Sequence, residues 1–222
     1  MKKLCIYFLV FSSLTLLSGC KFNFISNLYV PDLRKVASNE HTVIMTPATF
    51  EVEIPSKDDC AEFSTKLSEL MSDLISDISP KGCVDRGFET YLLMEAEIPI
   101  VNGFAKWLES TSMFGILMFE NNLGFSISLM NNLDKYKILN DRLSKEYHQT
   151  FDISKSTLTI VLNSSLNEEV VLMQDVFVNR KPVDRYLEYP LKRRTRVEII
   201  LSNVASGHLE SEGSAFAFIL KK

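Results

Sequence analysis

Short β-prone runs separated by turn residues place the strongest constraint on how this chain can fold. Five of them lie between residues 156 and 220, with the sequences STLTIVL, EEVVLM, DVFVN, RVEIIL and SAFAFIL. Turn-forming residues separate them at 163–165, at 179–182 and from Gly207 to Gly213. Several short strands at this spacing are typical of a β-sandwich. The sequence therefore predicts a small all-β, sandwich-like domain over residues 154–222.

The preceding region mixes strand and helix patterns. Phe50–Ile54 alternates apolar and polar residues, which indicates a half-buried strand. Tyr91–Ile100 predicts a second strand, and the apolar runs on either side of ENNLG predict a hairpin. Apolar residues at helical spacing predict two helices, over residues 57–78 and 133–147. We therefore expect an α+β chain, with a small α+β domain at residues 41–150 before the sandwich-like domain.

Two cysteines, Cys60 and Cys83, lie within this region. In an oxidising compartment, two thiols most simply form one disulfide. A straight helix of about 20 residues would separate them by about 30 Å, whereas the Cα atoms of a disulfide are ~4.4–6.8 Å apart. The bond therefore requires that Cys60 precedes the helix, that the helix is shorter or broken, or that the chain doubles back. A zinc site is disfavoured because no histidine is near either thiol.

The first 19 residues have the pattern of a signal peptide. Two lysines precede an apolar stretch of 14 residues, Leu4–Leu17. As a helix this stretch reaches about 21 Å, which is short of the ~30 Å hydrocarbon core of a bilayer. Ser18 and Gly19, which are small enough for a peptidase cleft, then precede Cys20. We expect residues 1–19 to be a removed leader rather than a membrane-spanning helix.

The sequence Leu17-Ser18-Gly19-Cys20 resembles the lipobox of bacterial lipoproteins. The resemblance implies that Cys20 becomes the first residue of the mature chain and carries fatty acyl chains such as palmitate. Two or three acyl chains give stable membrane attachment, whereas one binds reversibly. Lys21, in place of aspartate, implies the outer membrane and its periplasmic face. Residues 20–40, which show no clear periodicity, are expected to form the lipidated N-terminus and a tether. The alternative is that NLYVPDL docks on the body as an edge strand, since Pro31 argues against a central strand. The alternatives to lipidation are an ordinary signal peptide and an uncleaved membrane anchor.

Charge gives one further candidate site. The formal net charge is −4, so the chain has no overall attraction for nucleic acid. The run LKRRTRVEI nevertheless concentrates four cations, Lys192, Arg193, Arg194 and Arg196. Such a cluster can contact lipid headgroups or an acidic partner. The alternative is a solvated turn that keeps an edge strand from pairing.

Other chemical candidates are weak. If HLESEG is a strand, His208, Glu210 and Glu212 share one face of it. Glu95 and Glu97 likewise share one face of the strand predicted at Tyr91–Ile100. Solvated sheet surface is the simpler interpretation of both groups. No nucleophile, metal or phosphate-binding motif is present, so we predict no catalytic residues, no metal and no cofactor. Trp107, with Phe104 nearby, forms either a docking patch or part of a core.

These observations favour a non-enzymatic, lipid-anchored envelope protein that binds a partner protein at the membrane in an accessory, structural or exclusion role. One alternative is a periplasmic hydrolase of cell wall or sugar, with Glu95 and Glu97 or the histidines in a cleft. The other alternative is a carrier of an apolar ligand. A hydrolase needs a pocket where acids or histidines converge, a carrier needs an apolar cavity, and a partner-binding protein needs an exposed patch.

Overall fold

Strand β1 (Phe22–Tyr29) begins two residues after Cys20 and lies in the interior of a large sheet. It pairs antiparallel with β2 (Ile44–Ile54) and parallel with β7 (Thr157–Ser164). Alternate side chains of β1 are buried, which is the period expected of a strand with one face toward the core. The sequence predicts a tether over residues 21–40, but the structure has a central strand there, followed by a helix.

The computed structural model describes residues 21–39, 41–165 and 169–221. The predicted leader and the lipidated residue, Cys20, lie outside these residues. Within the described ranges, no helix has both the length and the apolar character that crossing a membrane requires.

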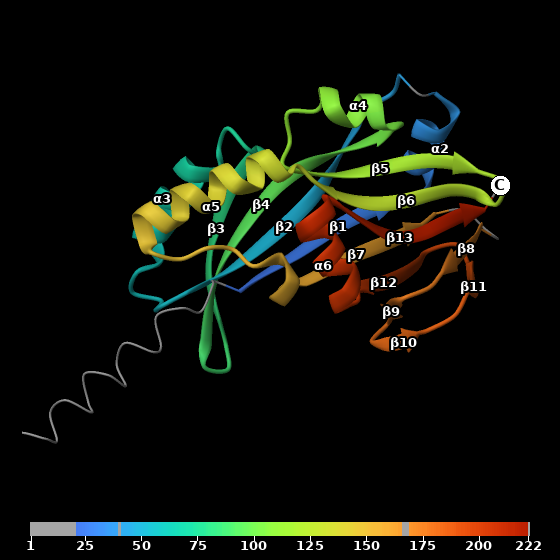
Figure 1. The fold of residues 1–222 in the computed structure, drawn as a ribbon. Coiled ribbons are helices and arrows are strands. Elements are labelled where there is room, and N and C mark those ends of the chain that lie inside the picture. Colours follow the sequence, from blue (N-terminus) through green and yellow to red (C-terminus); the bar gives the residue numbers. More distant parts are fainter. Residues whose placement is uncertain (1–20, 40, 166–168, 222) are drawn as a thin grey trace, which may run out of the picture.

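The remaining strands extend the sheet from both sides of β1 (Figure 1). On the β2 side the order is β4, β5, β6, β13, β8 and β11, and on the β7 side it is β12, β9 and β10. Strand β3 pairs with β4 outside this series. The bounds are Ser76–Arg86 for β3, Glu89–Asn102 for β4, Phe114–Asn121 for β5, Gly124–Asn131 for β6, Glu169–Met173 for β8, Val176–Val178 for β9, Lys181–Val183 for β10, Leu187–Leu191 for β11, Thr195–Leu201 for β12 and Ser214–Lys221 for β13.

The predicted division into an α+β domain and a separate sandwich-like domain is wrong. Strands from residues 41–150 and from residues 154–222 alternate in the same sheet, and their buried side chains form one main core. β1 joins the two regions directly, since Phe24 of β1 lies beside both Phe50 of β2 and Leu158 of β7. Periodicity identifies strands but carries no information about which strands pair, because pairing depends on contacts between residues distant in sequence.

A bent hairpin brings the two edges of the sheet together. Its first arm pairs with β13 as strand β8 and then, after Gln174 and Asp175, with β12 as strand β9. Its second arm consists of β10, which pairs with β9, and β11, which pairs with β8. Asp175 adopts a positive φ of 55°, which turns the chain at the bend. The sheet is therefore nearly closed, although the described strands β12 and β13 do not pair with each other.

The core is built around a group of phenylalanine rings on the inner face of the sheet. Phe114 of β5 lies 5.3 Å from Phe24 and 5.7 Å from Phe50, measured between ring centroids. Phe22 extends the group, with its centroid 6.3 Å from that of Phe114 and 5.0 Å from that of Phe151. All five rings are buried. Rings at these separations gain free energy beyond that from the area they bury.

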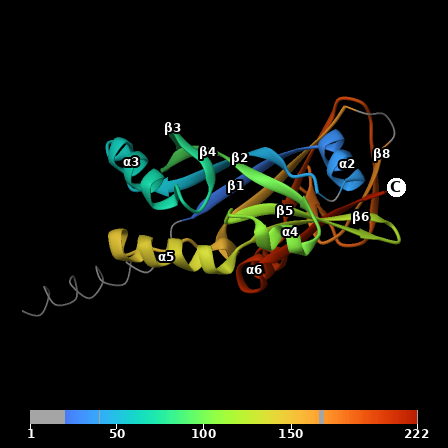
Figure 2. The same ribbon diagram turned by 90° about the horizontal axis from the view of Figure 1, so that it is seen from above.

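Helices lie at the ends and on the outside of the sheet (Figure 2). Helices α3 and α5 lie together at one end, where the rings of Phe63 and Tyr147 stack 4.7 Å apart and Arg142 binds the Asp73 carboxylate. Helix α2 covers the other end. Their bounds are Val30–Ser38 for α2, Cys60–Met71 for α3, Phe104–Glu109 for α4, Leu133–Tyr147 for α5, Ile153–Lys155 for the short 3-10 helix η1 and Asn203–Glu212 for α6.

Several local predictions are confirmed. The strands at Phe50–Ile54 and Tyr91–Ile100 lie within β2 and β4, and the hairpin around ENNLG is formed by β5 and β6. The helix expected over residues 133–147 is α5. The helix expected over residues 57–78 is instead shorter, because α3 ends at Met71 and the chain enters β3 at Ser76. The apolar residues after Met71 pack into the core from a turn and a strand rather than from a helix.

Candidate functional site

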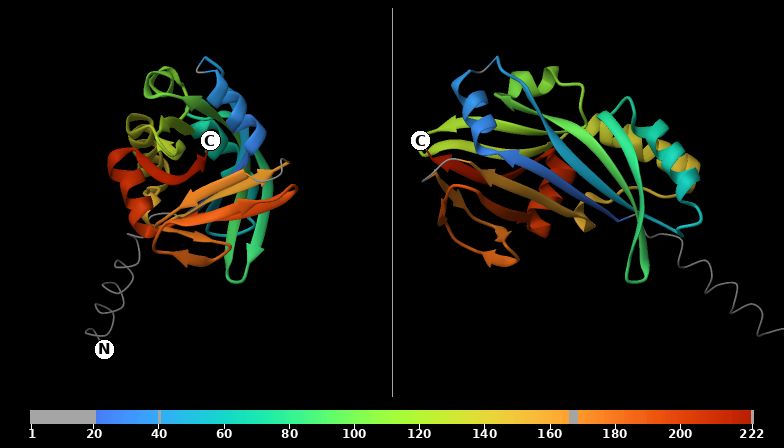
Figure 3. Two further views of the ribbon diagram at one scale, coloured as in Figure 1. Left: turned by 90° about the vertical axis from the view of Figure 1, so that its right-hand side faces the viewer. Right: turned by 180° about the vertical axis from the view of Figure 1, so that it is seen from behind.

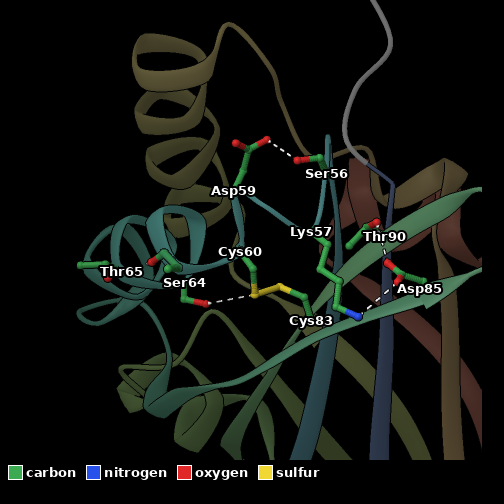
Figure 4. Close-up of a disulfide and its surroundings, with 10 residues drawn as sticks. Ser56, Lys57, Asp59, Cys60, Ser64, Thr65, Cys83, Asp85 and Thr90 are labelled. Carbon is green, nitrogen blue, oxygen red and sulfur yellow. Dashed lines mark hydrogen bonds and ion pairs between the residues drawn. A yellow bond between two sulfur atoms is a disulfide. The ribbon is translucent and has the colours of Figure 1, made fainter.

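The disulfide between Cys60 and Cys83 is present (Figure 4). Cys60 is the first residue of α3, and Cys83 lies on β3, which runs back past the start of that helix. Their Cα atoms are 6.1 Å apart, which is within the range of a disulfide. The two cysteines can approach because the helix is shorter than the sequence predicts and because the chain doubles back after it. A disulfide is consistent with an extracellular or periplasmic protein.

We expect the disulfide to contribute about 3 kcal/mol to the free energy of unfolding. The two cysteines are 23 residues apart, and the estimate follows from the chain entropy lost when a loop of that length is closed in the unfolded state. Chemical denaturation of the Cys60→Ser/Cys83→Ser double variant against the oxidised wild type measures the difference. Equal unfolding midpoints, or two free thiols in denatured and unreduced wild type, would contradict the prediction.

A groove of about 690 Å³ lies between the bent hairpin, helix α6 and the start of β13. We call it the α6 groove. It opens where the sheet fails to close, since β12 and β13 are joined through α6 rather than by strand pairing. Its apolar lining includes Val176, Phe177, Val183, Val204, Ala205 and Phe216. Volumes of this size and linings of this kind are typical of ligand or peptide sites.

Hydrogen bonds on the core side of α6 fix its position against the groove. The Glu210 carboxylate accepts hydrogen bonds from the Tyr136 hydroxyl at 2.8 Å and from the Ile153 backbone N–H at 3.3 Å. Burial, together with the hydrogen bond to Glu210, raises the pKa of Tyr136. The Ser202 hydroxyl caps the first turn, and Gly213 ends the helix with a φ of 78°. The helix is therefore held rigidly from behind.

The opposite face of α6 borders the groove with one apolar and two titratable side chains. Val204, His208 and Glu212 lie four residues apart, so they share a face of the helix. The Nδ1 atom of His208 lies 2.9 Å from a Glu212 carboxylate oxygen. Asp175 and Asp184 line the other wall, and none of the described groove residues is lysine or arginine. The groove thus combines an apolar floor with a predominantly acidic border.

The sequence-predicted grouping of His208, Glu210 and Glu212 on one strand face is wrong, because this stretch is helical. His208 and Glu212 border the groove, whereas Glu210 points to the core side. Sequence reasoning missed α6 because Gly207 and Gly213 indicate a turn. The signals that could have identified it are Ser202 as an N-cap and Gly213 as a C-terminal glycine.

The other candidates remain apart from the groove. Glu95 and Glu97 share the outer face of β4, where Glu95 pairs with Lys81 at 3.0 Å. His41 follows α2, and His148 caps the end of α5. Neither histidine is among the groove residues. Within the described ranges, no three histidine, cysteine or acidic side chains are grouped so that they could hold a metal ion.

Trp107 is buried and completes a small satellite cluster with Val101, Met130 and Leu117 on the outside of the sheet. It is 5% exposed, which makes it a packing residue rather than a docking residue. Phe104, on the same short helix, is exposed.

The basic cluster is exposed: Lys192, Arg193 and Arg194 form the turn between β11 and β12, and Arg196 lies at the start of β12. Its position follows from strand register. Arg196 pairs with Asn163 of β7, and Asn163 in turn pairs with Tyr29 at the end of β1. The cluster therefore lies at the end of the sheet that is remote from the start of β1.

Comparison with known proteins places the described body of the chain in one family. No curated protein matches the sequence. Residues 22–222 match the domain of unknown function DUF7424. The match begins at the first residue of β1 and includes all the strands of the sheet, the disulfide and the α6 groove. Since it covers most of the sequence, the chain belongs to the DUF7424 family.

Proposed function

We propose that this protein is a non-enzymatic lipoprotein, anchored through Cys20 to the periplasmic face of the outer membrane, that binds a partner protein in the α6 groove. The occupant would be an apolar segment of the partner that also carries positive charge. The observation that carries the binding function is the groove itself, which combines an apolar lining with the acidic border of Asp175, Asp184 and Glu212. The proposed anchor rests on the lipobox-like sequence Leu17-Ser18-Gly19-Cys20.

Exposure at the groove border supports a protein occupant. Val204 is 71% exposed and Phe177 is 38% exposed, and the two residues lie on opposite walls, on α6 and β9. Large apolar side chains held in such positions gain free energy when a partner covers them. The acidic border adds attraction for lysine or arginine at the edges of the bound segment, which favours the correct partner and speeds encounter.

Binding of an apolar small molecule is the second candidate, and the lining of the same groove favours it. The groove volume falls within the range of sites for drug-sized ligands. A crosslinker placed at the groove border would give a protein adduct if a protein segment occupies the groove and a small-molecule adduct if a ligand does. The mass of the adduct therefore distinguishes the two functions.

A photoreactive amino acid at Val204, introduced into the full chain in intact cells, should crosslink to a protein. The matched control position is Leu123, which is also exposed but lies in the β5–β6 turn. That turn adjoins Lys221 at the far end of β13, away from the groove residues Ser214 and Phe216. Leu123 should give no such adduct.

A substitution on the opposite wall should abolish the adduct. Phe177→Asp places a charge inside the apolar contact, and we expect the yield at Val204 to fall by about tenfold or more. Phe119→Asp, an equivalent change at an exposed phenylalanine of β5 outside the groove, should leave the yield unchanged. Adducts with lipids or small molecules alone would favour the carrier function, and equal adducts at Val204 and Leu123 would refute a specific site.

The basic cluster offers a separate contact for an acidic surface of the partner. Because it lies at the end of the sheet remote from the start of β1, it would face away from a membrane that holds Cys20. The geometry thus favours the partner-contact interpretation over contact with headgroups of the same membrane.

A further inference from the structure

A two-residue hairpin tip lies at the end of the molecule where the acylated cysteine would be attached. Strands β3 and β4 are joined through Gly87 and Phe88, between the paired residues Arg86 and Glu89. Figure 1 and Figure 3 show that this hairpin extends past its neighbouring strands, beside the start of β1. Gly87 has a φ of 68°, a conformation that suits glycine in so tight a turn. Phe88 is fully exposed.

Lys21, the residue that follows Cys20, is bound directly to this end of the molecule. Its backbone carbonyl accepts a hydrogen bond from the Glu53 N–H at 3.1 Å, and its ammonium lies 3.4 Å from the Glu89 carboxylate. Cys20 directly precedes Lys21 in the sequence. Acyl chains on Cys20 would therefore bring the bilayer surface to the base of the hairpin, with no flexible tether between them.

Polar contacts hold the hairpin in one position. The Arg86 guanidinium binds the buried Glu51 carboxylate at 2.5 Å, and Glu51 also accepts a hydrogen bond from Asn23 of β1 at 3.0 Å. The Tyr91 hydroxyl donates to Glu89, which keeps the pKa of that carboxyl below its usual range. These contacts connect the hairpin to β1 and β2, so Phe88 is presented by a rigid element.

We propose that Phe88 inserts into the lipid interface beside the acyl chains of Cys20 and thereby fixes the orientation of the body on the membrane. The inference rests on the proposed acylation of Cys20. In the described part of the chain, three cations on or beside the hairpin are paired with acids: Lys21 with Glu89, Lys57 with Asp85 and Arg86 with Glu51. The contact is therefore apolar rather than electrostatic, and it should not require anionic lipid.

The test uses tryptophan as a depth probe in the full acylated protein, reconstituted into phosphatidylcholine vesicles that contain brominated lipid. Phe88→Trp places the probe at the hairpin tip. The matched control, Tyr29→Trp, places it at an exposed position at the far end of β1, about 23 Å along the strand. Trp107 is buried in both proteins and supplies a common background.

We expect the Phe88→Trp protein alone to show blue-shifted emission and quenching by brominated lipid. Both signals should persist at high salt and without anionic lipid. Mass spectrometry of the same preparations reports whether Cys20 carries lipid, which tests the anchor separately. Unquenched tryptophan at position 88 in a protein shown to be acylated, or equal quenching at positions 29 and 88, would overturn the inference and leave the anchor standing.

Discussion

Replacing Cys20 with alanine should release the protein from the membrane or leave it as an unprocessed precursor. The expected effect is close to all or none, because each buried methylene of an acyl chain contributes about 0.8 kcal/mol and two or three chains act together. Removing the thiol removes the only atom that can accept the first acyl groups under this proposal. Membrane fractionation and the mass of the N-terminal peptide measure the result.

The leader supplies a matched control for this experiment. Cys5→Ala makes the same chemical change 15 positions earlier, in the stretch expected to be removed, and it should leave membrane association unchanged. A Cys20→Ala protein that is normally cleaved yet still held on the membrane would contradict lipidation. An unmodified N-terminus on the wild-type protein would contradict it as well.

Replacing Phe114 with alanine should lower the free energy of unfolding by about 3–5 kcal/mol. Phe114 is buried on β5, and its ring lies against those of Phe22, Phe24 and Phe50. Truncation removes the contacts of this ring with the neighbouring rings and leaves a cavity between β5 and the strands β1 and β2. A loss of this size is a large part of the stability of a typical domain.

Phe119→Ala is the control for this substitution. Phe119 lies on the same strand but is 62% exposed, so its truncation should change the free energy of unfolding by less than about 0.5 kcal/mol. Chemical denaturation of both variants with the disulfide intact gives the two values. Similar losses for Phe114→Ala and Phe119→Ala would show that the ring cluster is not the centre of the core.

The results for individual elements show where sequence reasoning succeeds. The alternation in Phe50–Ile54 and the helical spacing over residues 133–147 record which side of an element is buried, and both elements are present. The Cys60–Cys83 bond was predictable because these are the two cysteines of the sequence that lie outside the expected leader and the expected acylation site. Its geometry was not predictable, since the apolar spacing after Met71 fits a helix as well as a turn and a buried strand.

The α6 groove was beyond prediction for a different reason. Its walls come from the bent hairpin, from α6 and from β13, and they meet only because the sheet curves until its edges approach. Phe177 and Val204 are separated by 27 positions and follow no shared motif. In addition, Gly207 and Gly213 favour a turn, so the sequence did not predict helix α6, which borders the groove.

The sequence alone determined the features that depend on neighbouring residues: several strand segments, the β5–β6 hairpin and one long helix. Local periodicity and side-chain size suffice for these, because each element buries one face whatever it packs against. Only the tertiary structure decided that β1 joins both halves of the chain, that Lys21 pairs with Glu89 at the base of the β3–β4 hairpin and that the groove exists. These features depend on strand pairing and on closure of the sheet, whose free energy comes from contacts between residues far apart in the chain.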